Sequence, residues 1–150
     1  MTDFTFINPG ELRDEELELR TLKLCETEPE KQWVYGCIMG MYVGEDLVGQ
    51  VNLRLQDTPS LQRFAGHVGY EVNPEHRGKR YAERACRLVW PLMRAYGYTE
   101  VVITCLPDNV ASYRTIENLG GVFTGLEEVP PDHEMYQRNP SPRKRYVVTL

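Results

Sequence analysis

The chain has 150 residues, of which 41% are hydrophobic and 26% are charged, and its formal net charge is −5. This composition is ordinary for a soluble globular protein and suits one domain with one core, which we place over residues 1–150. A net negative chain repels phosphate, so the charge argues against a nucleic-acid-binding protein.

No apolar run approaches the roughly 20 residues that are needed to span a bilayer. The N-terminal residues are acidic, whereas a signal peptide starts with a basic and then an apolar region. We therefore expect a cytoplasmic protein that does not bind membranes.

The cysteines and histidines are scattered along the chain, without the close pairs of zinc or redox motifs. They are Cys25, Cys37, Cys86, Cys105, His67, His76 and His133. We expect the thiols to be reduced and mostly buried, and the sequence predicts no metal site.

The first elements in chain order are a strand and a helix. Residues 3–8 alternate apolar and polar side chains, which predicts a short strand. In residues 11–28, Leu12, Leu17 and Leu24 fall near helical spacing, so we expect an amphipathic helix that ends before Pro29. This segment is strongly acidic, and its charge is either that of a solvated helix face or a surface that attracts an amine.

Three strands and a second helix follow. Residues 32–43 and 47–56 are rich in β-formers and are separated by a hairpin signal, and after a loop residues 63–72 predict a further strand. Apolar residues then recur with helical spacing over residues 82–96, with Gly97 as the stop. Pro91 lies inside this pattern, so we expect a kink or break near Val89, or two shorter helices.

The last third of the chain predicts a buried strand over residues 100–106 and a helix capped by Asp108 or Asn109 that ends at Gly120. Two final strands, residues 122–129 and 143–150, flank a Pro-rich loop. The order β-α-β-β-β-α-β-α-β-β predicts an α/β domain with a mixed sheet and helices packed on it.

The junction before the second helix has the chemistry of an anion site. A helix N-terminus leaves four N–H groups unpaired and carries roughly half a positive charge. Gly78 lets an anion approach the backbone, and Arg77, Lys79 and Arg80 add charge-assisted contacts. Since both the Walker loop and the G-x-G-x-x-G motif are absent, a solvated helix start or an unrelated phosphate-binding enzyme are the alternatives.

Residues 68–123 as a whole resemble the acetyl-CoA-binding core of the GNAT superfamily of N-acyltransferases. The resemblance lies in a strand ending in V-x-P, an R-x-x-G-x-G/A-like turn, an apolar strand and an N-x-x-S-x-x-x-x-E-x-x-G helix, in family order and spacing. It implies that the central strands are splayed and that the pantetheine arm of acetyl-CoA lies between them.

The resemblance also implies a set of cofactor-binding residues. They are Tyr70, Val72, Arg77, Gly78, Lys79, Arg80, Tyr81, Ala82, Asn109 and Ser112. The Val72 N–H would polarise the thioester carbonyl, and Asn109 would orient the pantetheine amides. Arg80 stands where most relatives have glycine; we expect it inside the helix, with its side chain turned outward toward the 3′-phosphate of the nucleotide.

The implied catalytic residues are a base and an acid. Glu71 is the first choice of base and His67 the second, while a surface carboxylate and a hydrogen-bonded core histidine are the alternatives for them. Many relatives carry a tyrosine acid at the position of Ile116, so Ser112 or Tyr113 would protonate the leaving thiolate instead. Ser112 alternatively only bonds its own helix.

We therefore expect direct transfer of an acetyl group from acetyl-CoA to a primary amine of a small molecule or a peptide N-terminus. A homodimer is compatible with this function. The acceptor would lie between the first helix, the strand with Trp33 and Tyr35, and the loop over residues 130–142. A degenerate acyl-CoA-binding regulatory module is the alternative, because Arg80 and Ile116 depart from the family pattern.

Overall fold

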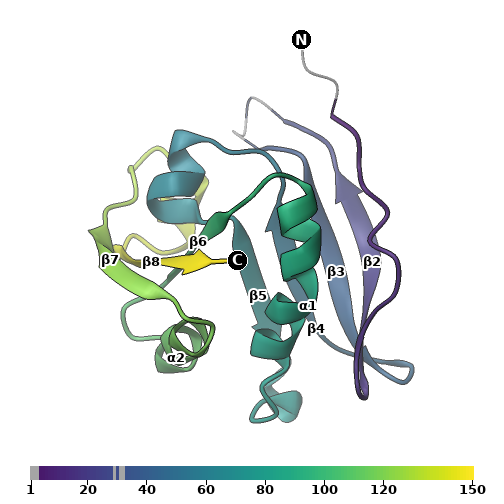
Figure 1. The fold of residues 1–150 in the computed structure, drawn as a ribbon. Coiled ribbons are helices and arrows are strands. Elements are labelled where there is room, and N and C mark those ends of the chain that lie inside the picture. The colour runs from purple at the N-terminus through teal and green to yellow at the C-terminus, as the bar shows by residue number, and fades with distance from the viewer. Residues whose placement is uncertain (1–3, 29, 31–32) are drawn as a thin grey trace.

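The computed structural model describes residues 4–28, 30 and 33–150. They form an antiparallel sheet with strand order β1-β2-β3-β4-β5 and a second sheet with order β6-β8-β7 (Figure 1). The first sheet contains β1 (Leu12–Asp14), β2 (Leu17–Cys25), β3 (Gly36–Val43), β4 (Asp46–Arg54) and β5 (Val68–Val72). The second contains β6 (Glu100–Cys105), β7 (Val122–Glu127) and β8 (Arg143–Thr149). The α/β fold class that the sequence predicts is confirmed, whereas the predicted mixed sheet is replaced by two sheets whose described strand pairs are all antiparallel.

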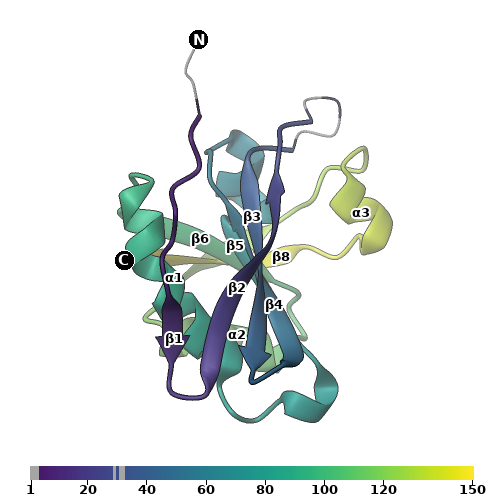
Figure 2. The same ribbon diagram turned by 90° about the vertical axis from the view of Figure 1, so that its right-hand side faces the viewer.

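In the part of the chain that the structure describes, three α-helices and two short helical turns lie between the named strands. They are α1 (Tyr81–Ala95), α2 (Val110–Asn118), α3 (Glu134–Arg138), the π-helical turn η2 (Leu61–Ala65) and the 3-10 turn η3 (Pro74–His76). Helix α3 lies to one side of the first sheet (Figure 2). No described helix is long and apolar enough to cross a membrane.

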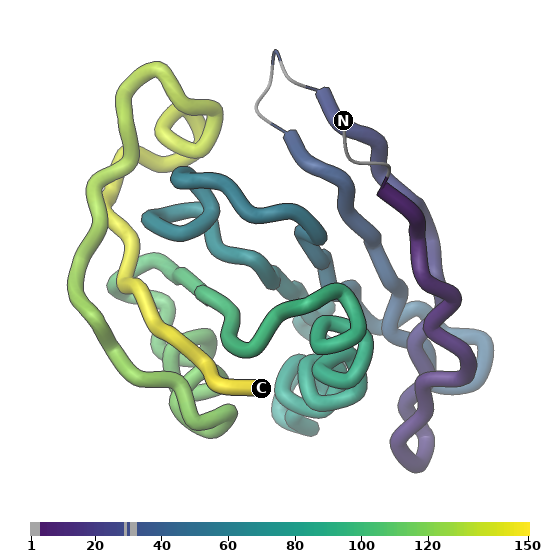
Figure 3. Tube along the Cα trace, turned by 45° about the horizontal axis from the view of Figure 1, so that its top comes forward, coloured from purple at the N-terminus to yellow at the C-terminus, as the bar shows by residue number. Residues whose placement is uncertain are grey.

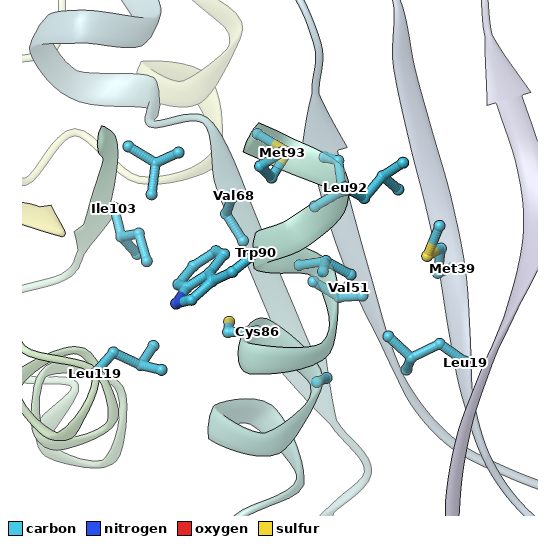
Figure 4. Close-up of a cluster of buried hydrophobic side chains, with 14 of the residues drawn as sticks. Leu19, Met39, Val51, Val68, Cys86, Trp90, Leu92, Met93, Ile103 and Leu119 are labelled. Carbon is cyan, nitrogen blue, oxygen red and sulfur yellow. The ribbon is translucent and has the colours of Figure 1, made fainter. Parts of the chain in front are cut away.

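Helix α1 is the centre of the hydrophobic core. It lies between strands β1–β4 on one side and the second sheet on the other (Figure 3). Its side chains Cys86, Trp90 and Met93 pack between Val51 of the first sheet and Ile103 of the second (Figure 4). Each fully buried side chain of this size contributes about 1.5–3 kcal/mol, so the helix holds the two sheets at a fixed separation.

The predicted acidic helix over residues 11–28 is wrong, because this segment forms the hairpin β1–β2. Leu17 and Leu19 are buried at 0% and 5% exposure, whereas Glu18 between them and Arg20 after them lie at the surface and form an ion pair. This is the period of two of a strand with one buried face. The left-handed φ of 53° at Glu15 closes the turn between the strands.

The predicted strand over residues 3–8 is also wrong for the part that the structure describes, residues 4–8, which has no regular secondary structure; Asp3 lies outside the described residues. Phe4 stacks on Tyr35 at a centroid distance of 4.3 Å, and Phe6 meets the same ring edge-on. The Ile7 N–H donates to the Tyr96 hydroxyl. The alternating apolar residues therefore serve an aromatic cluster and not a sheet.

Helix α1 continues past Pro91, so the expected break and division into two helices are wrong. Pro91 lies on the exposed side of the helix, where water can satisfy the carbonyl that loses its N–H partner. Residues 63–72 are a strand only from Val68, because the turn η2 occupies residues 61–65 and Gly66 follows it with φ +77°. The cysteines are free thiols, and Cys37, Cys86 and Cys105 are buried as expected.

Candidate active site between two diverging strands

Strands β5 and β6 meet at one point and belong to different sheets. The His67 N–H donates to the Val102 carbonyl at 2.7 Å, and the Val102 N–H donates to His67 Nδ1 at 2.8 Å. Beyond this contact β5 pairs with β4, and β6 pairs with β8 (Figure 1). The backbone of Gly66 approaches β6 so closely that a Cβ there would lie 3.0 Å from the Val102 oxygen. The splayed central strands that the sequence predicts are therefore present.

The register of β5 shows which backbone groups point into the divergence. The Asn73 N–H donates to the Val48 carbonyl, and Tyr70 is paired with Val51. In an antiparallel pair alternate residues bond to the neighbouring strand, so the N–H and C=O groups of Tyr70 and Val72 point away from β4. These are the two strand residues that the sequence analysis assigned to the cofactor.

The start of α1 lies beyond the end of β5 and offers further N–H donors. No side chain caps this helix, so the backbone N–H groups of its first turn, which begins with Tyr81 and Ala82, are available to an anion. Gly78 has φ +92°, and nothing lies within 4 Å of the position that a Cβ would take. Arg77 is exposed, and its Nε donates to the Val72 carbonyl at 3.1 Å.

Arg80 does not lie inside the helix, which corrects the sequence-based expectation. It is the N-cap residue of α1 and has left-handed backbone angles, with φ 60° and ψ 29°. Glycine adopts this conformation without strain, whereas other residues pay about 1–2 kcal/mol. The backbone therefore accounts for glycine at this position in related sequences. The Arg80 side chain is exposed, as expected, and so is Lys79.

The acidic β1–β2 turn forms a clamp on α1. Arg84 donates from Nε to Asp14 at 2.6 Å and from a terminal nitrogen to Glu16 at 2.7 Å. The Tyr81 hydroxyl also donates to Glu16 at 3.1 Å. The hydrogen bond from Arg84 lowers the pKa of Glu16 to about 2. These carboxylates are bound to groups of the chain itself, which removes them from the surface that the sequence analysis offered to an amine.

The pleat of β5 places the side chains of Glu71 and Tyr70 on opposite faces of the sheet. Glu71 is paired with Gln50 and lies on the face away from α1, here called the open face (Gln50, Asn52, Arg54, Gly69 and Glu71). Its side chain is exposed. Tyr70 is paired with Val51 and packs on the face that α1 covers. A group held between β5 and β6 is therefore accessible to a carboxylate from one side and to a hydroxyl from the other.

Tyr70 reaches across to α2 on the helix side. Its hydroxyl lies 3.1 Å from Ser112 Oγ and 3.2 Å from the Ser112 carbonyl oxygen. Burial raises the pKa of the Tyr70 hydroxyl, so it remains protonated at neutral pH. Burial also raises the pKa of the Cys105 thiol, although a hydrogen bond with Ser112 opposes the shift. No sequence motif indicates that Tyr70 and Ser112 form a pair.

The other residues of α2 have mainly structural contacts. Asn109 is the N-cap and its side-chain oxygen accepts the Ser112 N–H at 3.2 Å, so its amide nitrogen is the part left for a ligand. Lys144 Nζ lies 4.0 Å from the centroid of the Tyr113 ring. Ile116 is fully buried, and a hydrocarbon side chain in the core cannot supply an acid.

His67 is a hydrogen-bonded core residue, which was the alternative to its role as a base. Its side chain is buried, and Nε2 lies 2.8 Å from the Asp57 carboxylate while Nδ1 accepts the Val102 N–H. Burial alone would raise the pKa of Asp57, but hydrogen bonds from His67 and Gln62 outweigh it and lower this pKa. Both ring nitrogens are occupied, so His67 holds the strands together and has no lone pair to offer.

A cavity of about 320 Å³ lies between the start of β3, the end of β4 and α3. Trp33 and Glu134 both line it, and the Trp33 Nε1–H donates to Glu134 Oε1 at 2.9 Å. Trp33 and the loop over residues 130–142, which are two of the walls expected for the acceptor site, thus line the same cavity. Tyr35 packs instead on Phe4, and the third wall is the end of β2.

Arg143 fixes the loop that carries α3. It is buried, and its guanidinium donates to the carbonyls of Met135, Asn139 and Ser141. Burial lowers the pKa of this arginine. The loop over the cavity is thus tied to β8. No sequence pattern indicates this contact, because its acceptors are backbone groups.

Comparison with known proteins agrees with this geometry. The family model of the acetyltransferase (GNAT) domain matches residues 2–122. The chain belongs to the GNAT acetyltransferase family. No curated protein sequence matches it significantly.

Several solved structures share the GNAT fold. A ribosomal-protein-S5-alanine acetyltransferase from Vibrio fischeri is 13% identical, with a TM-score of 0.68 over 93% of this chain and 96% of that chain. A microcin C7 self-immunity acetyltransferase in complex with acetyl-CoA and AMP is 20% identical, with a TM-score of 0.57 over 81% and 63% of the two chains. A GNAT-family acetyltransferase from Bacillus anthracis is 19% identical, with a TM-score of 0.58 over 75% and 65%. The chain therefore spans less than two thirds of the length of the last two.

Proposed function

We propose that this GNAT-family protein transfers an acetyl group from acetyl-CoA directly to a primary amine of a small molecule or of a peptide N-terminus. The observation that carries the proposal is the free edge of β5, where the backbone groups of Tyr70 and Val72 point into the divergence from β6. The peptide acceptor is included because the neighbour from Vibrio fischeri is a ribosomal-protein-S5-alanine acetyltransferase.

The residues around the divergence fit acetyl-CoA. The edge of β5 offers the N–H groups of Tyr70 and Val72 and the C=O of Tyr70 to an extended amide chain such as pantetheine, as a sheet edge does to an added strand. The Val72 C=O accepts from Arg77 in this structure. The uncapped start of α1 and the open space at Gly78 suit a diphosphate. The exposed side chains of Lys79 and Arg80 lie beside this position in the chain and can contact further phosphate oxygens.

The chain's own residues supply the proton chemistry. Acetyl-CoA provides an activated thioester, and an alkylamine must lose a proton to attack it, because the ordinary amine pKa is about 10.4. Glu71 on the open face is the group that accepts this proton, directly or through water. The Val72 N–H donates to the thioester oxygen, and Ser112, held by Tyr70, donates to the leaving sulfur on the helix side.

Parallel thermal melts with acetyl-CoA, CoA and ATP test the cofactor, and thiol release with a panel of amines tests the reaction. We expect both CoA forms to raise Tm by several degrees, ATP to do so less, and at least one amine to release thiol. Binding without thiol release from any amine would indicate the acyl-CoA-binding module instead. Equal stabilisation by ATP and CoA would indicate a phosphate-binding protein of another kind.

A further inference from the structure

Arg54 is a charged side chain that lacks a matching partner. It ends β4, lines the cavity beside β3, and is partly buried. Its one side-chain hydrogen bond among the described residues goes to the Gly66 carbonyl, at 3.4 Å. No described carboxylate forms an ion pair with it, since the nearby Glu134 accepts from Trp33. Several of its five donors are therefore left for the cavity.

The other enclosed arginines of the protein show how unusual this is. Arg84 binds two carboxylates, and Arg143 donates to three backbone carbonyls. Removing a guanidinium from water is costly unless such partners replace the lost hydration. Burial lowers the pKa of Arg54, and the neighbouring charge of Arg138 lowers it further. An anion in the cavity would satisfy Arg54 in the way that Asp14 and Glu16 satisfy Arg84.

Arg54 also points along the open face toward Glu71. A Cβ on Gly69 would lie 3.4 Å from one terminal nitrogen of Arg54 and 3.8 Å from the other, so the guanidinium occupies the space over Gly69. Gly69 and Glu71 lie on the same face of β5, about 7 Å apart along the strand. One small molecule can therefore contact both side chains, provided that its amine and its anionic group are separated by only one or a few atoms.

We propose that the acceptor is an amine that carries a carboxylate or phosphate close to the nitrogen, with the anionic group bound by Arg54 and the amine directed toward Glu71. The inference rests on the proposed acetyltransferase function and narrows its acceptor. In the reaction the amine nitrogen bonds to the acetyl carbon and the C–S bond breaks. Glu71 takes the amine proton and releases it to solvent, and the leaving thiolate of CoA takes up a proton from solvent to become the thiol. Arg138, which also lines the cavity, adds positive charge at its exposed side.

Matched acceptor pairs test this with the wild-type protein. We would compare alanine with alaninamide, and ethanolamine phosphate with ethanolamine, by kcat/KM for thiol release from acetyl-CoA, corrected for the free-amine fraction. The anionic member of at least one pair should be preferred by roughly tenfold or more, since a charge-assisted contact is lost with the other. The acceptor pair that shows this preference tells whether the site binds a carboxylate or a phosphate. Equal or better use of both neutral members would overturn the inference.

Variants place the effect on Arg54. Arg54→Met keeps most of the side-chain volume and should bring the ratio of the preferred pair to within about twofold of one, because kcat/KM for the anionic acceptor falls. Arg94→Met, which removes an exposed arginine of α1, should keep the wild-type ratio. The proposed role of Arg54 would be contradicted by either of two results with folded Arg54→Met. One is an unchanged ratio of kcat/KM for the acceptor pair, and the other is a loss of activity toward the neutral acceptor as well.

The remaining outcomes separate this inference from the function on which it rests. Turnover of amines without preference for an anionic group overturns the inference alone. Failure of every amine to release thiol, together with no stabilisation by acetyl-CoA, overturns the acetyltransferase function itself. Should Arg54→Met fail to fold, inhibition of the wild type decides: propionate should compete with the acceptor and propionamide should not, and equal inhibition by both would count against the anion site.

Discussion

The Tyr70 hydroxyl lies 3.1 Å from the Ser112 hydroxyl and thereby links β5 to α2 across the divergence of the two sheets. The Tyr70 hydroxyl also donates to the Ser112 carbonyl at 3.2 Å. In the contact between the two hydroxyls either oxygen can be the donor, and when Tyr70 donates, the Ser112 proton is free for the leaving sulfur. Tyr70 thus holds the Ser112 side chain in place at the start of α2.

Substitution of this pair should affect the rate in a coupled way. We expect Ser112→Ala and Tyr70→Phe each to lower kcat about 3- to 10-fold, a modest loss because thiols with a pKa near 8.5 leave readily. The double variant should be no slower than the slower single variant, since both remove the same donor. Steady-state thiol release at saturating acetyl-CoA measures this. A larger loss in Tyr113→Phe than in Ser112→Ala would identify Tyr113 as the acid.

Glu71→Gln removes the proposed base without changing the size of the side chain. We expect kcat/KM for the amine to fall about 10²-fold or more at pH 7, as is typical when a general base is lost. The deficit should shrink at high pH, where more amine is already neutral, and acetyl-CoA affinity should stay the same. Glu75→Gln, an exposed neighbour beyond β5, is the control. Full activity of Glu71→Gln at pH 7 would mean that the amine loses its proton elsewhere.

Arg80→Gly should stabilise the protein, because glycine takes the left-handed N-cap conformation without strain. We expect a gain of about 1 kcal/mol in the free energy of unfolding, measured by urea denaturation. Acetyl-CoA affinity should stay within a factor of a few, since backbone donors supply the main contact. Lys79→Gly is the control. Because Lys79 does not have a positive φ, this substitution should not raise the free energy of unfolding. A loss of binding above tenfold in Arg80→Gly would show that the arginine is itself a ligand.

Glu16→Gln tests the clamp between the β1–β2 turn and α1. The pKa of Glu16 is lowered from 4.5 to about 2 by the hydrogen bond from Arg84, so its charge stabilises the folded state above pH 4.5 and this contribution is lost as the pH falls toward 2. We expect the variant to be less stable than the wild type at pH 7 and equally stable near pH 2. Urea denaturation across this range provides the measurement. The exposed Glu15→Gln should show no such convergence.

The sequence predicts the core of the fold from β3 onward, because the later strands and α1 have distinct periods and clear turn residues. It fails at residues 11–28, where Leu12, Leu17 and Leu24 fall near a helical period, while only Leu17 and Leu19 follow the period of two of a strand. The pair Leu17 and Leu19 decides the question only once β3 is seen beside it. Phe4 and Phe6 mislead for a related reason, since their alternation serves contacts with Tyr35, far along the chain.

The site shows the same division between local and long-range information. The turn at Gly78 and the strand residues Tyr70 and Val72 follow from short motifs. The strained backbone of Arg80, the pair of Tyr70 with Ser112, and the unpaired guanidinium of Arg54 do not, because each depends on how separate elements are placed in space. Such contacts are 42 residues apart in the case of Tyr70 and Ser112.

The backbone groups of Tyr70 and Val72 that do not pair with β4 have a consequence for handling the protein without ligand. A strand with unsatisfied donors and acceptors is a template for another chain, and natural proteins screen such strands with charge. Arg77 does this here by occupying the Val72 carbonyl. The ligand-free protein should consequently aggregate more readily than the complex. Bound acetyl-CoA should keep the protein soluble because it covers this edge of β5.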